Sequence, residues 1–132
     1  MQPRMTHLCL HVDNLEDCVH FYRQYCGMEV LADRTENGEG SIYLATGAGD
    51  VEPVFQLKSG GKSQVPSDSE ERHFGFAVES RAAVDRIAAT AKHNGILFWP
   101  ADEYLPGAYF CGVRDPNGNC VEFSYGHPVP PA

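Results

Sequence analysis

The chain has 132 residues, 42% of them hydrophobic and 21% charged, which is typical of one globular domain or of two half-size modules that share a core. Its formal net charge of −8 argues against nucleic acids and anionic membrane surfaces as partners, because both require basic patches. No apolar run approaches the roughly 20 residues of a membrane span, and the N-terminus has no apolar signal-peptide core, so we expect a cytoplasmic protein.

The N-terminal half predicts a strand, a helix and three further strands. Residues Met5–Val12 alternate in character and predict the first strand. Asp13 lies three residues before Glu16 and predicts a capped helix start, and Gly27 is placed to end that helix in the left-handed conformation. Gly- and Asn-rich turns at 36–38 and 47–50 separate the later stretches. The three further strands are predicted near Met28–Ala32, Ser41–Thr46 and Val51–Leu57.

The pattern restarts after residues 58–72, a polar segment rich in Ser and Gly that predicts a linker. A strand at His73–Glu79 is followed by a helix that Ser80 caps and that Asn94-Gly95 ends. Further strands are predicted near Ile96–Trp99, Ala108–Arg114 and Asn119–Tyr125, with a turn at Asp115-Pro116-Asn117-Gly118 before the last. We therefore expect a single domain, residues 1–132, made of two βαβββ modules at about 5–58 and 72–126.

Two pairs of polar residues recur at matching places in the two modules. His7 is followed 49 positions later by Gln56, and His73 is followed 49 positions later by Glu122, so both members are offset by 66 residues. A duplicated module explains this spacing. The expected fold is α+β, with the two modules forming a curled, mostly antiparallel mixed sheet around a cavity on which all four side chains converge.

These residue types indicate a metal site. Neutral imidazole nitrogen and carboxylate oxygen are common ligands of divalent Zn, Ni, Co, Mn or Fe, and two His with one Glu also match non-haem iron sites. Gln56 adds at most a weak neutral oxygen. A strand histidine is more often a hydrogen-bonded core residue, but the repeated offset favours the ligand interpretation. The residues expected to line the substrate pocket are Cys9, His11, Tyr43, Phe55, Trp99 and Tyr109.

The five cysteines do not contribute to this site by their spacing. Their number is odd and no C-x-x-C occurs, which indicates neither a disulfide framework nor a zinc knuckle. Most are expected to be small buried apolar residues.

Two runs resemble the vicinal oxygen chelate superfamily. The first is His7-Leu-Cys-Leu-His-Val-Asp-Asn-Leu with Phe21-Tyr22 and Gly27-Met28; the second is His73-Phe-Gly-Phe-Ala-Val with Arg114-Asp115-Pro116-Asn117-Gly118-Asn119 and Glu122. The resemblance implies metal ligation by His7, His73 and Glu122, with Gln56 at a position where bacterial glyoxalase I usually has Glu. The superfamily includes glyoxalase I, extradiol dioxygenases, fosfomycin-resistance transferases, epimerases and metal-free antibiotic-binding proteins.

The leading functional expectation is a glyoxalase I-like, metal-dependent lyase or isomerase acting on a small oxygen-chelating substrate. Glu122 is the expected catalytic base, because a carboxylate released from a metal can also take a proton. One alternative is an extradiol-type Fe(II) dioxygenase on the same ligands. The other is a non-catalytic protein of the bleomycin-resistance type that binds a small molecule such as an antibiotic. The resemblance also implies a homodimer.

Overall fold

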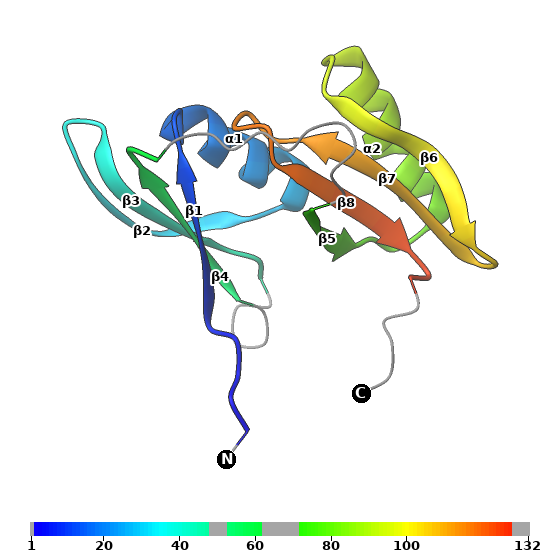
Figure 1. Cartoon of the computed structure of the whole chain (residues 1–132), viewed down its shortest axis with the longest axis horizontal. Coiled ribbons are helices and arrows are strands. Elements are labelled where there is room, and N and C mark those ends of the chain that lie inside the picture. The colour runs from blue at the N-terminus through cyan, green and yellow to red at the C-terminus, as the bar shows by residue number, and fades with distance from the viewer. Residues whose placement is uncertain (1, 48–52, 62–71, 128–132) are drawn as a thin grey trace. The chain divides into compact units, whose positions relative to one another are not determined.

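The computed structural model describes residues 2–47, 53–61 and 72–127 and divides the chain into two compact units, Met1–Gln64 and Val65–Ala132. Each unit has the element order βαβββ (Figure 1). The predicted α+β class with two βαβββ modules is therefore confirmed. Residues 62–71 of the predicted linker and residues 48–50 of the predicted turn lie outside the described residues.

The N-terminal unit contains one four-stranded mixed sheet and one helix. The elements are β1 (His7–Val12), α1 (Leu15–Cys26), β2 (Glu29–Glu36), β3 (Glu39–Ala45) and β4 (Val54–Ser59). The strand order is β1-β4-β3-β2, in which β1 and β4 are parallel and the other pairs are antiparallel. The unit's core lies between α1 and one sheet face, where Tyr22 packs on Phe55 with ring centroids 5.5 Å apart.

Helix α1 begins one residue later than predicted. The N-cap is Asn14 rather than Asp13: its side-chain oxygen accepts a hydrogen bond from the Asp17 backbone N–H at 3.1 Å, and its Nδ2 donates to Asp17 Oδ2 at 2.6 Å. This two-way bonding satisfies one of the donors that a helix start leaves open, which makes Asn14 the better cap. The predicted end is confirmed, because Gly27 has a φ of 63° in the left-handed region.

The C-terminal unit repeats the arrangement. Its elements are β5 (His73–Ala77), α2 (Arg81–His93), β6 (Leu97–Leu105), β7 (Ala108–Arg114) and β8 (Cys120–Tyr125), with strand order β5-β8-β7-β6. The predicted cap is confirmed, since the Ser80 hydroxyl accepts from the Ala83 backbone N–H at 3.0 Å. Helix α2 packs on β6, β7 and β8 (Figure 1). No helix in the described ranges is long and apolar enough to cross a membrane.

Strand β6 is longer than predicted, because it continues through Pro100 to Leu105. Proline cannot donate a ladder hydrogen bond and is tolerated at sheet edges and bulges. β6 is the edge strand, and its pairing with β7 shifts register between Trp99 and Asp102. A proline that ended the strand in the sequence pattern therefore sits in a β-bulge in the structure.

The turn before β8 forms around a buried carboxylate, in agreement with the prediction for 115–118. Asp115 is only 3% exposed, and its Oδ1 accepts the backbone N–H groups of Asn117 at 2.9 Å and Asn119 at 2.8 Å. Its Oδ2 accepts from Asn119 Nδ2 at 3.0 Å. Gly118 supplies the positive φ, 88°, that such a turn needs. This turn fixes where β8 begins.

The register of the parallel strand pair is the same in both units. Cys9 lies opposite Gln56 in the β1–β4 pair, and Gly75 lies opposite Glu122 in the β5–β8 pair. The members of these pairs differ by 66 positions, the offset found in the sequence. Each unit thus holds a histidine two residues before the position that faces its Gln or Glu, so the pair shares one sheet face.

Candidate active site

A pocket of about 460 Å³ lies in the C-terminal unit. It occupies the sheet face that helix α2 does not cover. Side chains alternate along β7, so Cys111 faces α2, where its Sγ contacts the Val84 carbonyl, whereas Phe110 faces the pocket. The lining residues are His73, Trp99, Pro100, Asp102, Tyr104, Phe110, Glu122 and His127.

His73 and Glu122 face one another on the pocket wall. His73 Nε2 lies 3.9 Å from Glu122 Oε1, and the two side chains are 34% and 14% exposed. They stand on neighbouring parallel strands, two residues out of register, which places both on one face. Gly75 leaves room for the carboxylate, because a Cβ at that position would lie 3.1 Å from Glu122 Oε2. The pair is thus packed against its strands and open to the pocket.

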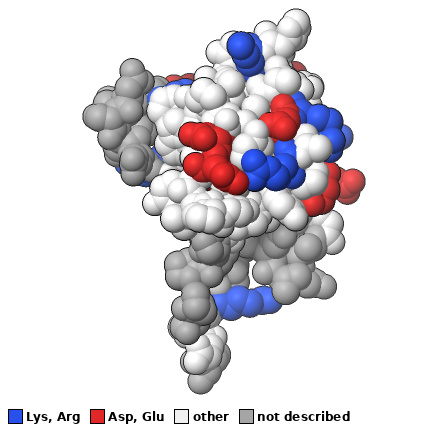
Figure 2. Space-filling model, turned by 90° about the vertical axis from the view of Figure 1, so that its right-hand side faces the viewer, with Lys and Arg blue, Asp and Glu red and all other residues white. Residues whose placement is uncertain are grey.

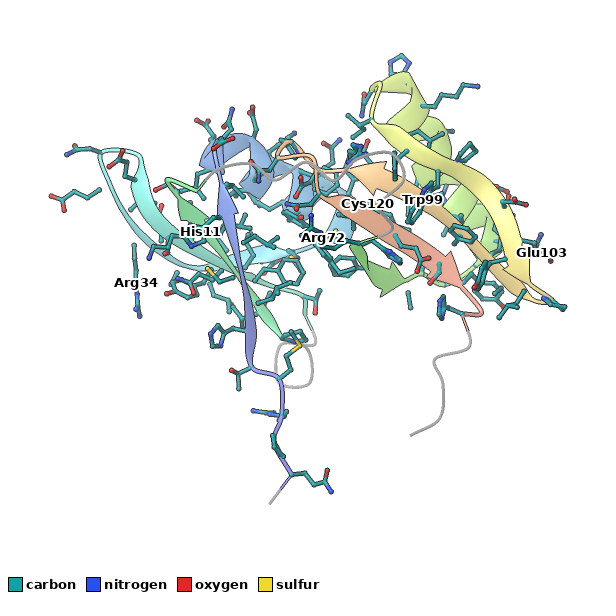
Figure 3. All side chains as sticks on the ribbon, viewed as in Figure 1. His11, Arg34, Arg72, Trp99, Glu103 and Cys120 are labelled. Carbon is teal, nitrogen blue, oxygen red and sulfur yellow. The ribbon has the colours of Figure 1, made fainter. Side chains whose placement is uncertain are left out.

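Trp99 forms the neighbouring wall. Trp99 is labelled in Figure 3. It lies on β6 opposite Gly112 of β7, and Gly112 in turn lies opposite Glu122 of β8, so Trp99 and Glu122 flank one glycine. A Cβ at Gly112 would come within 2.6 Å of Trp99 Cε3, which shows that the indole rests directly on the glycine backbone. The His73 and Trp99 rings meet edge to face, with centroids 5.1 Å apart. The indole thereby limits the space beside the His73–Glu122 pair.

The bulge in β6 brings Asp102 to the same face as Trp99. Residues three apart on a regular strand point to opposite faces. Trp99 pairs with Gly112 and Asp102 with Phe110, so three residues of β6 span two residues of β7. Re-aiming a side chain in this way is a common role of bulges beside functional sites. Asp102 consequently joins Trp99 and Phe110 in the pocket lining.

Two side chains of this pocket, His73 and Glu122, can bind one divalent metal ion. The 3.9 Å between His73 Nε2 and Glu122 Oε1 is shorter than two metal–ligand bonds placed end to end, about 4.2 Å, so one ion can touch both atoms. The Glu122 side chain occupies the space over Gly75 that a Cβ would otherwise fill. In the described ranges, no three His, Cys, Asp or Glu side chains gather closely enough to hold an ion.

The N-terminal unit places several predicted site residues on one face of its own sheet. Cys9, Gln56 and Tyr43 lie opposite one another across β1, β4 and β3. The Gln56 amide donates to Ser41 Oγ at 3.0 Å, which holds the side chain along the sheet. This row is equivalent to Gly75, Glu122 and Gly112 of the other unit. The residues of this face that were predicted for the site are therefore brought together within their unit.

The two predicted histidines of β1 flank this row. His7 lies within 2.8 Å of the Thr6 hydroxyl through Nδ1, and its side of the strand is exposed. His11 is backed by Gly61, where a Cβ would lie 1.9 Å from the His11 Cβ. Both histidines share the face of Cys9, as strand alternation predicts.

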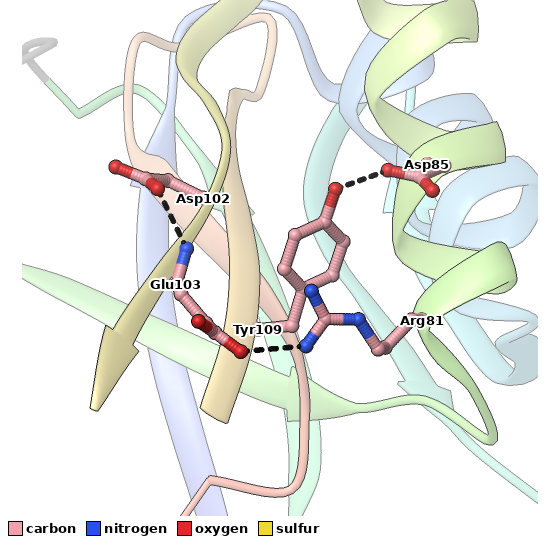
Figure 4. A network of polar contacts seen from close by, with 5 residues as sticks. All are labelled: Arg81, Asp85, Asp102, Glu103 and Tyr109. Atoms are coloured by element: carbon pink, nitrogen blue, oxygen red, sulfur yellow. Dashed lines mark hydrogen bonds and ion pairs between the residues drawn. The ribbon is translucent and has the colours of Figure 1, made fainter. Parts of the chain in front are cut away.

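Two residues predicted to line the pocket lie elsewhere. Phe55 is 5% exposed and packs on Tyr22 in the core, because Gln56 beside it takes the open face. Tyr109 faces helix α2, where its hydroxyl donates to Asp85 and its ring stacks under the Arg81 guanidinium at 4.1 Å (Figure 4). The hydrogen bond to Asp85 raises the pKa of Tyr109. Strand alternation gives its neighbour Phe110, not Tyr109, to the pocket.

Five lining residues were not predicted for the site: Pro100, Asp102, Tyr104, Phe110 and His127. Phe110 carries a usable signal, because alternation along β7 separates it from the helix-facing Cys111. Asp102 and Tyr104 carry none without knowledge of the bulge, since β6 was expected to stop before Pro100.

The buried cysteines near the site are unreactive by their environment. Burial, with a smaller contribution from the charge of Glu122, raises the pKa of Cys111 to about 12. Burial likewise raises the pKa of Cys120 to about 11. A thiol that stays protonated is a poor nucleophile and metal ligand. Cys9 is exposed, unlike these two.

Charges outside the pocket are mixed. Acidic and basic side chains lie next to one another on the face shown in Figure 2. Arg81 pairs with Glu103 at 2.9 Å and Arg86 with Glu79 at 3.4 Å, and all four side chains are at least half exposed. Exposed pairs of this kind contribute little to stability. The pocket differs, because its eight described lining residues include Asp102 and Glu122 but neither Lys nor Arg.

Comparisons with known proteins support the fold and the motifs. A sequence model of the Glyoxalase/Bleomycin resistance protein/Dioxygenase superfamily matches residues 4–123. Uncharacterized protein PA2024 of Pseudomonas aeruginosa is 44% identical over 132 residues, which cover 99% of this chain and 94% of that protein.

Solved structures share the architecture. The trypanothione-dependent glyoxalase I of Leishmania major is 25% identical with a TM-score of 0.68, over 95% of this chain and 88% of that chain. The fosfomycin resistance protein FosX of Listeria monocytogenes is 17% identical with a TM-score of 0.75, over 96% of each chain. The lactoylglutathione lyase of Agrobacterium tumefaciens is 22% identical with a TM-score of 0.66, also over 96% of each.

Proposed function

Because this chain belongs to the Glyoxalase/Bleomycin resistance protein/Dioxygenase superfamily, we propose that it is a metal-dependent, glyoxalase I-like lyase or isomerase. Its substrate is a small molecule with two neighbouring oxygen atoms. The observation that carries the proposal is the His73–Glu122 pair, which meets at 3.9 Å on the wall of a 460 Å³ pocket. Members of the superfamily generally use divalent metals.

The proposed metal ligands are His73 and Glu122, joined by His7, with Gln56 as a weak fourth. The support for His7 and Gln56 is the identical register of the two parallel strand pairs, which makes them the counterparts of His73 and Glu122. The expected ion is Zn, Ni, Co, Mn or Fe. When bound, such an ion supplies Lewis acidity to the neighbouring oxygens of the substrate.

Glu122 is the proposed catalytic base. Its carboxylate accepts the proton from the carbon next to a substrate carbonyl and returns it to the neighbouring carbon. Gly75 leaves room for this carboxylate, because a Cβ there would lie 3.1 Å from Glu122 Oε2. Trp99 excludes water beside the carboxylate, because its indole lies on Gly112 next to Glu122. The Gln56 amide cannot act as a base, so of the two equivalent positions only Glu122 can accept the proton.

The experiment is a comparison of turnover and metal content in Glu122→Gln. A screen of α-oxoaldehyde–thiol adducts and catechols first identifies a substrate for the unmodified protein. Glutamine keeps a ligand oxygen but cannot take the proton, so turnover should fall at least about 100-fold while most of the metal is retained. Glu103→Gln is the matched control, because Glu103 pairs with Arg81 and does not line the pocket. Full activity in Glu122→Gln would contradict the proposed base.

A second candidate is favoured by the aromatic part of the pocket. Trp99, Tyr104 and Phe110 form a wall on which an apolar ring can stack without any chemistry. A binding protein of this kind would hold an aromatic ligand equally well with and without metal, and would turn over none of the screened compounds. Oxygen consumption on a catechol would instead assign the extradiol-type dioxygenase reaction. Superfamily members often form dimers, and sedimentation tests the proposed homodimer.

A further inference from the structure

We infer that the pocket selects a substrate that carries an amine cation, separated from its two neighbouring oxygens by a flat aromatic ring, and that Asp102 recognises the cation. That the substrate has two neighbouring oxygens rests on the proposed function. Its ring and its amine are inferred from other residues of the same pocket. The substrate class is therefore an arylalkylamine with vicinal oxygens.

The aromatic wall favours a flat ring. Trp99 and Phe110 meet at 78° with centroids 6.2 Å apart, and Tyr104 and Phe110 meet at 86° with centroids 6.1 Å apart. Rings set nearly at right angles offer both a face and an edge to a guest. Faces of this kind also attract cations, because the ring quadrupole is negative above the plane. Tyr104, which is 69% exposed, stands at the open side of this wall.

The charges of the lining favour a cation. Asp102 is the lining carboxylate that the proposed metal site does not use, and the eight described lining residues include no Lys or Arg to attract an anionic tail. The net charge of the chain, −8, acts in the same direction. A substrate with a carboxylate tail would be repelled by the Asp102 carboxylate, and a selective pocket uses such repulsion to reject the wrong substrate.

Asp102 and Glu122 lie in neighbouring cross-sheet rows, two strands apart. Glu122 shares a cross-sheet row with Trp99, whereas Asp102 shares the next row with Phe110 and Ser124. Two residues along a strand and two strand spacings across the sheet separate their Cα atoms by about 12 Å. One ring with a short tail reaches from one side chain to the other. An ion at Glu122 and a cation at Asp102 can therefore be accommodated together.

Asp102 is held in place by a backbone N–H of its own strand. Its Oδ1 accepts the Glu103 backbone N–H at 2.7 Å, and the Glu103 side chain accepts from Arg81 Nη1 at 2.9 Å (Figure 4). The β6 bulge points Asp102 into the pocket, while Glu103 points away to the helix side. Asp102 therefore lies in the pocket and Glu103 outside it, so removing the charge of each in turn separates the effect of the pocket from that of net charge.

The test measures the affinity of three catechols that differ only in their tails: dopamine with an amine, hydroxytyrosol with a hydroxyl and dihydroxyphenylacetate with a carboxylate. The Zn²⁺-loaded protein is titrated without oxygen. Quenching of Trp99, the chain's single tryptophan, reports binding, and calorimetry checks it. Dopamine should bind most tightly and dihydroxyphenylacetate least. Asp102→Asn should weaken dopamine about fivefold and leave hydroxytyrosol nearly unchanged.

Glu103→Gln removes the same charge on the helix side and should leave all three affinities within about twofold. Equal effects of Asp102→Asn and Glu103→Gln, tightest binding of the carboxylate, or no saturable binding of any of the three would overturn the inference. All three compounds share the catechol, so failure of the proposed metal site weakens them together. Failure of the cation assignment instead removes the difference between them.

Discussion

Replacing Gly112 with alanine should displace Trp99 and narrow the pocket. The added Cβ would lie 2.6 Å from Trp99 Cε3, 2.9 Å from Cδ2 and 3.2 Å from Cβ. Ordinary carbon–carbon contacts are about 3.5–4.0 Å, so the indole must retreat by roughly 1 Å. Because its Cβ is also close, rotation of the ring alone does not relieve the contact, and strand β6 must shift as well.

The expected loss of stability is about 1 kcal/mol, the lower end for an overpacked site, because Trp99 is only partly buried and can move outward. Urea unfolding measures this loss. The emission maximum of Trp99, the single tryptophan, should move to longer wavelength as the ring gains water. Affinity for the aromatic probes should fall in parallel, since the ring surface on which they stack has moved.

Two controls make the result specific. In a Trp99→Phe background the smaller ring leaves space for the added Cβ, so Gly112→Ala should lower the free energy of unfolding clearly less. The double-mutant cycle should then show coupling between positions 99 and 112. In Gly75→Ala the added Cβ would meet Glu122, at 3.1 Å from Oε2 and 3.3 Å from its Cβ and backbone oxygen, and the tryptophan emission should stay unchanged. Parental stability together with parental emission in Gly112→Ala would refute the placement of Trp99 on this glycine.

Four further results are expected. At pH 8 a thiol reagent should label the exposed Cys9 well before Cys111 or Cys120. Burial raises the pKa of Cys111 and Cys120 above the ordinary 9.0, so the folded state keeps these two protons at a pH where the unfolded chain loses them. The free energy of unfolding should therefore fall as the pH rises from about 9 towards 12. Asp115→Ala should cost about 3 kcal/mol in urea unfolding because two backbone N–H groups lose their acceptor, and a loss below about 0.5 kcal/mol would contradict the role of that carboxylate. Gln56→Glu should retain the metal in elemental analysis, and loss of the ion would argue against a ligand position there.

The repeat in the sequence predicted the equivalent strand pairs of the two units because β-pairing preserves spacing. Two histidines and their partners offset by 66 residues required equivalent strands, and the structure gives those strands the same register. Capping residues also predicted where two of the helix ends lie. Ser80 and Gly27 act through bonds and dihedral angles of their own neighbourhood, so no tertiary contact could override them.

The remaining features depend on tertiary structure. Pro100 ends a strand by local rules, but at a sheet edge it fits into a bulge, and this bulge decides that Asp102 faces the pocket. Tyr109 and Phe110 are both plausible pocket aromatics by type. Only the position of helix α2 assigns Tyr109 to the helix side and Phe110 to the pocket.

The most direct test of the proposed site is elemental analysis of freshly purified protein and of His73→Ala. His73 is on the pocket wall, 34% exposed in its side chain, so its removal should leave the fold intact by circular dichroism. The unmodified protein should contain one divalent ion per site, and His73→Ala should contain nearly none, because a site of three ligands rarely survives the loss of one. Unchanged metal content in folded His73→Ala would contradict the assignment of His73 and Glu122 as the metal-binding pair.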